Sequence, residues 1–216
     1  MKLLLTSGGI TNPTIEAELV RLLGKPIAES TALVIPTAQW GHPSCGPESV
    51  RRVVVGTPSF AGLPFASVGA LELTALPTIG ADRWHAWVRE ADVLLVDGGD
   101  ATYLNHWMRE SGLLDLLPSL TDTVWVGVSA GSMVMTPRIG PEFAHWSEDD
   151  RTLGLVNFSI FPHLNHPDMT ENVMSEAEKW AASLGGPAYA LDDASAISVV
   201  DGVVAVVSEG EWHQLQ

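Results

Sequence analysis

The fold of this chain is decided by the stretch Trp125-Val126-Gly127-Val128-Ser129-Ala130-Gly131-Ser132-Met133-Val134-Met135. Residues 123–128 are rich in strand formers and residues 130–135 are compatible with an apolar helix, so the pattern predicts a strand, a sharp Gly-x-Ser-x-Gly turn and a helix. Such a turn strains the backbone but lifts the serine hydroxyl clear of the sheet. We therefore expect Ser129 to be a nucleophile. The alternative is an ordinary serine in a glycine-rich connection.

Short apolar runs alternate with amphipathic stretches along the rest of the chain, which is typical of a mostly parallel sheet with helices on both faces. The expected strands are 3–6, 32–36, 70–73, 93–96, 123–128, 155–161 and 188–191, and the expected helices are 14–23, 81–90, 102–117, 130–135 and 168–184. A β meander follows, with Asp201-Gly202 as a type I′ hairpin turn between strands 196–200 and 203–207. We therefore expect one doubly wound α/β domain over residues 1–216, built on a single sheet.

The composition excludes several classes of protein. Acidic residues outnumber basic ones by 26 to 11, which leaves a formal net charge of −15, and the sequence has no cluster of lysine or arginine. Such a charge repels nucleic acid and anionic membranes. The chain has a single cysteine, Cys45, so it cannot form an internal disulfide. Cys45 lies at no predicted strand-to-helix corner, which argues against a nucleophilic role. The apolar run after Lys2 is too short for a secretory signal. We therefore expect a cytoplasmic protein without a nucleic-acid or membrane partner.

Four sites follow predicted strands, at the carboxyl edge where functional groups gather in open α/β sheets. They are Gly98-Gly99, Ser129, His163 and Asp192-Asp193. A serine nucleophile needs a nearby imidazole to take its proton, and the imidazole needs an acceptor that fixes its tautomer. His163 and one of the two aspartates can fill these roles from successive strand ends.

An oxyanion needs N–H donors, and the backbone groups of Gly99 and Ala130 are the expected ones. Each site also has a structural alternative. The glycine pair is compatible with a plain βα turn, the aspartate pair with a polar turn, and His163 with a loop histidine. His163 and His166 also have a spacing found in zinc pairs, with Asp168 as a candidate third ligand.

The order of these motifs resembles the peptidase E family of serine peptidases, which includes α-aspartyl dipeptidases and, more distantly, cyanophycinases. The matching stretches are Gly98-Gly99-Asp100-Ala101-Thr102, Gly127-Val128-Ser129-Ala130-Gly131, Phe161-Pro162-His163 and Asp192-Asp193. The resemblance covers residues 3 to about 200. It implies a fold similar to class I glutamine amidotransferases, which carry cysteine at the corner where this chain has Ser129.

The resemblance also implies roles for individual residues. Ser129 would be the nucleophile and His163 the base, with an acidic third member of a triad. Asp193 stands where the family usually has glutamate, so its shorter side chain must approach the histidine differently. Asp192 and Glu142 are the alternatives, and the chain order of serine, histidine and acid leads us to prefer Asp193.

Together these features predict a serine peptidase of exopeptidase or dipeptidase type that acts on short peptides, with no metal or organic cofactor implied. Arg138 has three interpretations: it binds the side-chain carboxylate of an Asp-X dipeptide, it binds the terminal carboxylate for a carboxypeptidase, or it pairs with Glu142 at the surface. The alternative class is a non-catalytic member of the fold that binds a small metabolite. The eight tryptophans can line the core or an interface, so a homodimer stays open.

Overall fold

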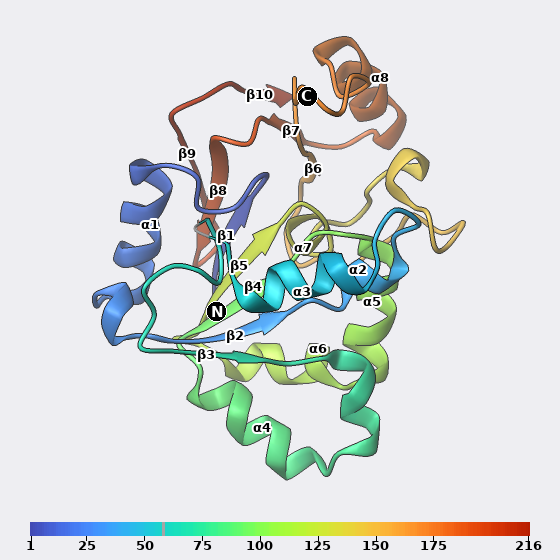
Figure 1. Ribbon diagram of the computed structural model, residues 1–216. Coiled ribbons are helices and arrows are strands. Elements are labelled where there is room, and N and C mark those ends of the chain that lie inside the picture. The colour runs from blue at the N-terminus through green and yellow to red at the C-terminus, as the bar shows by residue number, and fades with distance from the viewer. Residues whose placement is uncertain (58) are drawn as a thin grey trace.

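The computed structural model describes residues 1–57 and 59–216, and this part of the chain is built around a seven-stranded sheet (Figure 1). The order across the sheet is β3-β2-β4-β5-β1-β8-β9. Its strands are β1 (Lys2–Thr6), β2 (Thr31–Ile35), β3 (Ser67–Ala70), β4 (Val93–Val96), β5 (Val124–Val128), β8 (Ser195–Val200) and β9 (Val203–Ser208). The first five are parallel, and β8 and β9 extend the sheet in antiparallel fashion. The expected α/β class with a mostly parallel sheet is confirmed.

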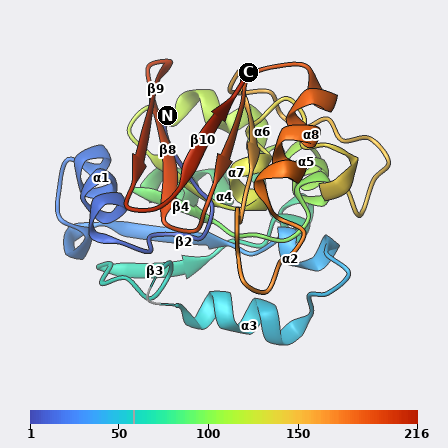
Figure 2. The same cartoon turned by 90° about the horizontal axis from the view of Figure 1, so that it is seen from above.

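The alternation of side chains along β1 divides the core between the two faces of this sheet. Leu3 and Leu5 face one side and Leu4 the other, as the period of a strand requires. The first face is covered by α4 (Ala81–Glu90), α5 (Ala101–Glu110), α6 (Leu113–Leu116) and α7 (Ala130–Met133). The second is covered by α1 (Pro13–Leu23), which lies beside β8 and β9 (Figure 2).

The remaining short elements connect these layers. After β2 come α2 (Ala38–Gly41) and α3 (Pro47–Val55). Short 3₁₀ helices are formed by Ile27–Glu29, Leu73–Thr78, Leu117–Ser119 and Pro141–Phe143. No helix in the described residues is both long and apolar enough to cross a membrane.

The register of the central strands brings three strand ends to one edge. In β5, Gly127 is level with Val96 of β4 and Val128 with Thr6 of β1. The residues that follow β1, β4 and β5 therefore emerge side by side, and Ser129 is among them.

A second, smaller sheet lies beside the main one and differs from the single sheet expected from the sequence. Its strands in the described residues are β6 (Ser159–Phe161), β7 (Ala188–Leu191) and β10 (Trp212–Leu215), in the order β10-β7-β6. β6 and β7 pair in parallel, and the unexpected C-terminal strand β10 covers the other edge of β7. Helix α8 (Met174–Leu184) packs Trp180 and Ala177 against this sheet.

Several element boundaries differ from the sequence-based expectation. The predicted helix 168–184 begins only at Met174, and the predicted helix 102–117 is interrupted at Gly112, whose φ of 82° lies in the left-handed region. The strand expected over 155–161 is confined to its last three residues. The predicted hairpin turn has positive φ at Asp201 and Gly202, as a type I′ turn requires.

Candidate active site

Ser129 occupies the corner between β5 and α7 in a strained backbone conformation. Its φ of 48° and ψ of −110° cost a residue with a side chain about 1–3 kcal/mol. Its N–H group is held at 3.1 Å by two carbonyl oxygens, those of Thr6 and Ser7 at the end of β1. The neighbouring strand therefore stabilises the conformation that presents the hydroxyl above the sheet.

The two glycines of the corner allow close backbone packing. A Cβ atom on Gly127 would collide with the backbone carbonyl of Gly131, and a Cβ atom on Gly131 would collide with the carbonyl oxygen of Val96. The indole of Trp125, on β5, donates a hydrogen bond of 2.9 Å to the Gly131 carbonyl and so stabilises the close approach of α7 to the sheet. The Gly-x-Ser-x-Gly spacing is thus required by the contact between α7, β5 and β4.

His163 and Asp193 form a hydrogen-bonded pair at the ends of β6 and β7. His163 Nδ1 lies 2.7 Å from Asp193 Oδ1. Burial alone would raise the pKa of Asp193. The net effect is nevertheless a pKa below the usual value, because His163 contributes a hydrogen bond and its charge, Ser7 a hydrogen bond and His166 its charge. Because an ionised carboxylate only accepts hydrogen bonds, the proton of this contact belongs on Nδ1, which leaves Nε2 free to accept one.

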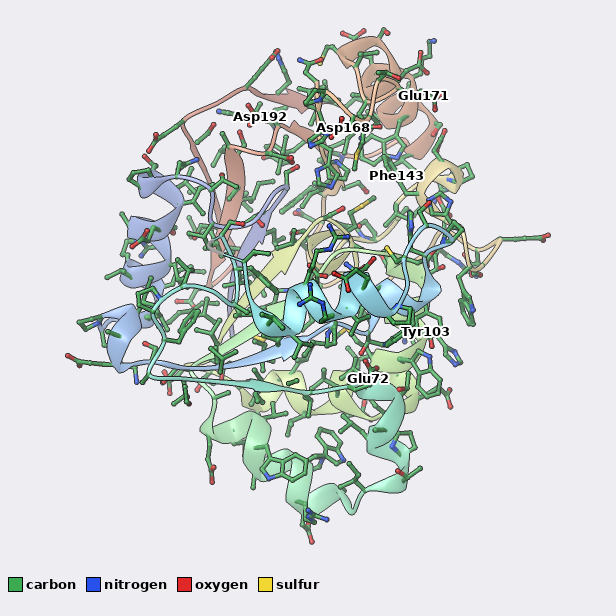
Figure 3. The ribbon with its side chains drawn as sticks, in the orientation of Figure 1. Glu72, Tyr103, Phe143, Asp168, Glu171 and Asp192 are labelled. Carbon is green, nitrogen blue, oxygen red and sulfur yellow. The ribbon has the colours of Figure 1, made fainter. Side chains whose placement is uncertain are left out.

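The two other candidate acids occupy different positions. The Asp192 carboxylate binds groups that shape the turn after β7: the N–H groups of Ala194 and Glu211 and the hydroxyl of Ser195. Figure 3 shows Asp192 at the end of the molecule that carries the smaller sheet. Glu142 lies on an exposed 3₁₀ turn at the rim of the Ser129 pocket. The geometry therefore favours Asp193 as the partner of His163.

Ser129 and His163 line one pocket of about 510 Å³. Its walls come from the ends of β4 and β5, from α2, and from the loops after α7 and β6: Gln39, His42, Cys45, Gly98, Gly99, Ala101, Val128, Ala130, Met133, Glu142, Phe143, His145, Pro162, Met169 and Asn172. In the described part of the chain Ser129 and His163 share no direct hydrogen bond. Catalytic contacts of this kind commonly tighten only when substrate is bound.

The two residues expected to supply the oxyanion donors, Gly99 and Ala130, also line this pocket. Ala130 is the first residue of α7, so its N–H group has no partner within the helix and lies at the positive end of the helix dipole. Gly98 lies against the Ser129 side chain, and Gly99 has a φ of 132° because its backbone packs directly on Ala38 and Gln39. The Gly99 donor therefore belongs to backbone that is too closely packed to admit a side chain.

The structure does not bring Arg138 into the pocket. Its Nε and Nη2 atoms bind the two carboxylate oxygens of Asp150 at 3.2 and 2.9 Å, in place of the Glu142 partner considered from the sequence. The backbones of Arg138 and Arg151 also pair in an isolated antiparallel β-bridge, which joins the two ends of the loop 138–151. The proximity of Arg138 to Ser129 in sequence is not reproduced in space, because the chain turns away after α7.

His166 lies near the candidate acid without a direct place in the pocket. Its Nε2 is 3.6 Å from Asp193 Oδ2, and its Nδ1 accepts the backbone N–H of Asp168. In residues 1–57 and 59–216 no group of three or more His, Cys, Asp or Glu side chains is arranged to hold a metal ion.

Three polar residues of the site were not found from the sequence. His42 and His145 lie on the pocket wall with their rings edge to face, 5.1 Å between centroids. Ser7 follows β1 and binds both His163 and Asp193. The two histidines carry no recognisable motif, but Ser7 stands at a strand end, the same signal that indicated the other sites.

A strained serine at a strand-to-helix corner, facing a pocket lined also by a histidine that is hydrogen-bonded to an aspartate, is typical of a serine hydrolase with an α/β fold. The model of peptidase family S51 matches residues 3–207, so the chain belongs to that family and is a serine peptidase. A search of curated protein sequences found no match to the chain.

Two solved structures are similar to this one along nearly its whole length. A protein from Listeria monocytogenes EGD-e, described as a candidate peptidase E, is 18% identical with a TM-score of 0.69, and the match covers 97% of this chain and 98% of that one. A peptidase from an acI-B1 Actinobacterium is 19% identical with a TM-score of 0.70, covering 100% of this chain and 90% of the other. At these identities the likeness establishes the fold alone.

Proposed function

We propose that this peptidase cleaves short peptides, with Ser129 as the nucleophile, His163 as the general base and Asp193 as the residue that orients His163. The observation that carries this proposal is the 2.7 Å contact between His163 Nδ1 and Asp193 Oδ1 at the pocket that holds Ser129. Because Nδ1 binds Asp193, the opposite nitrogen of the ring, Nε2, carries no proton and can take the proton of Ser129.

The reaction proceeds in two steps. His163 Nε2 takes the proton of Ser129 Oγ as that oxygen bonds to the substrate carbonyl carbon, and the N–H groups of Ala130 and Gly99 stabilise the negative oxygen that forms. The carbon–nitrogen bond then breaks, and His163 returns the proton to the departing amine. Water, activated by the same imidazole, hydrolyses the acyl group from Ser129.

The size of the pocket supports short substrates. A volume of about 510 Å³ falls in the range of sites that enclose a small molecule, about 300–1,000 Å³. The turn 166–173 and the loop 141–146 both contribute residues to its lining. We propose an exopeptidase or dipeptidase, with the Asp-X dipeptidase and the carboxypeptidase as its two variants.

Both variants need a group that binds a carboxylate. The residues that line the pocket in the described structure include no lysine or arginine, and Arg138 holds Asp150. Apart from the proposed base His163, the basic side chains of the described wall are His42 and His145. The pKa of His42 is lowered first by burial and then by the charge of His145. Because its pKa is lowered, His42 offers a hydrogen bond and not a permanent positive charge at neutral pH.

Digestion of a peptide library, read by mass spectrometry, tests the proposal. Release of single residues or dipeptides from short peptides is expected, and it reveals the preferred terminus and side chain together. A fluorophosphonate probe should label wild-type protein at Ser129 and fail to label Ser129→Ala. A protein that binds peptides but neither cleaves them nor reacts with the probe would be a binding member of the fold instead.

A further inference from the structure

Ser7 is a fully buried residue that contacts all three members of the proposed triad. It directly follows β1, on the strand that pairs with β5 and supports the corner at Ser129. Its carbonyl oxygen accepts the N–H of Ser129 at 3.1 Å. Its hydroxyl oxygen lies 2.7 Å from the backbone nitrogen of His163 and 2.8 Å from Asp193 Oδ1.

We propose that Ser7 is a positioning residue that locks His163 and Asp193 in the geometry needed for catalysis; this inference rests on the proposed function. The direction of each hydrogen bond follows from chemistry. The His163 N–H can only donate, so the hydroxyl oxygen accepts it, and the single hydroxyl proton then points to the Asp193 carboxylate.

The contact restrains His163 through its backbone. The φ of His163 is 58°, in the left-handed region that residues with side chains seldom occupy. The hydrogen bond from its N–H to Ser7 stabilises this conformation and so directs the imidazole toward Asp193.

The same hydroxyl restrains the carboxylate. Asp193 Oδ1 receives both the Ser7 hydroxyl and His163 Nδ1, while Oδ2 faces His166 Nε2 at 3.6 Å. Without Ser7 the carboxylate loses one of the two bonds that fix its rotation and can turn toward His166. The imidazole of His163 would then lose its orientation although every member of the triad is still present.

Ser7→Ala tests this inference, measured as kcat and KM across pH. Loss of a hydrogen bond to a charged group corresponds to about a 10- to 100-fold fall in kcat, and KM should change less than about threefold because Ser7 does not line the pocket. The Ser7 hydroxyl lowers the pKa of Asp193, so the acidic limb of the rate profile should move to higher pH. In an Asp193→Asn background the further loss from Ser7→Ala should be small, since Ser7 acts through that carboxylate.

Two further variants make the test decisive. Ser7→Cys keeps nearly the same volume with a weaker donor, so it should lose activity even if the Ala variant is unstable. Ser30→Ala removes one hydrogen bond of a buried serine far from the pocket, to the Pro26 carbonyl, and should leave kcat unchanged.

The inference is overturned if folded Ser7→Ala keeps wild-type kcat and pH profile. It is equally overturned if the fall in kcat caused by Ser7→Ala adds fully to the fall caused by Asp193→Asn. It is also overturned if neither Ser7 variant folds, because Ser7 would then serve folding alone. The proposed function fails separately, through Ser129→Ala: a variant that still cleaves peptides would remove the triad itself, whatever Ser7 does.

Discussion

His163 and Asp193 are joined from Nδ1 to Oδ1 across the two parallel strands β6 and β7, although 30 residues separate them in the chain. These strands belong to the smaller sheet, whereas Ser129 follows a strand of the main sheet. The proposed triad is therefore divided between two sheets. Its geometry therefore depends on the contacts that join the two sheets.

Ser129→Ala should abolish hydrolysis while leaving the fold intact. Removal of a serine nucleophile leaves only the contribution of binding and of the oxyanion donors, so kcat should fall by at least about 1,000-fold. Steady-state kinetics on a short peptide, with circular dichroism as the control for folding, measures this. Turnover close to wild type in the folded variant would exclude Ser129 as the nucleophile.

His163→Ala should be about as damaging as Ser129→Ala, and the double variant hardly worse, because groups that act as a unit give non-additive losses. His166→Ala is the matched control. Its ring lies 3.6 Å from the far oxygen of Asp193 and should matter much less. Equal damage from His166→Ala, or activity restored by added zinc, would indicate a metal site.

Asp193→Asn and Asp192→Asn should affect different properties. The first leaves His163 without an acceptor that fixes its tautomer and should lower kcat by several orders of magnitude. The second weakens the bonds that shape the turn after β7 and should lower the free energy of unfolding by about 1–3 kcal/mol with little effect on kcat. Urea unfolding measures the stability of these two variants and of Glu142→Gln, and steady-state kinetics measures their kcat. The size of the fall in kcat ranks the three carboxylates as candidates for the third member of the triad. A reversed ranking would relocate the third member of the triad.

Gly131→Ala should be strongly destabilising, by about 3 kcal/mol or more, because the new methyl group would meet the carbonyl oxygen of Val96 and backbone cannot yield as a side chain can. Gly186→Ala is its control, since a Cβ atom there meets nothing within 4 Å. Thermal unfolding of the two variants measures the difference. Equal melting temperatures would show that α7 can move away from β4 without cost.

The corner at Ser129 could be predicted from sequence because its pattern is local: strand, turn and helix follow one another within eleven residues. The clustering of His163 and Asp193 could also be predicted, because parallel strands end at the same edge. The division into two sheets could not. Alternating strands and helices do not say which strands pair, and the short strands β6 and β7 pair with each other. The structure also gives Ser7 contacts to residues 156 and 186 positions away, which no local pattern encodes.

Arg138 shows where sequence proximity misleads. It lies nine positions after Ser129, yet its guanidinium binds both oxygens of Asp150 on the returning part of the same loop. We therefore expect Arg138→Ala to loosen this loop and to lower kcat/KM by a similar factor on all peptides. Arg138→Lys should rescue poorly, because an ammonium group cannot bind both carboxylate oxygens in the same planar way.

The Arg138 variants are tested by measuring kcat/KM on matched pairs of substrates. One pair compares Asp-X with Ala-X peptides, and the other compares a free with an amidated C-terminus. Asp150→Asn is the control variant, because it breaks the same ion pair while keeping the arginine. If Arg138 acts only through the loop, both variants lower kcat/KM alike on every peptide. A loss confined to Asp-X for Arg138→Ala alone would show that the arginine leaves Asp150 to bind an acidic side chain. A loss confined to the free C-terminus would show that it binds the terminal carboxylate, as in a carboxypeptidase.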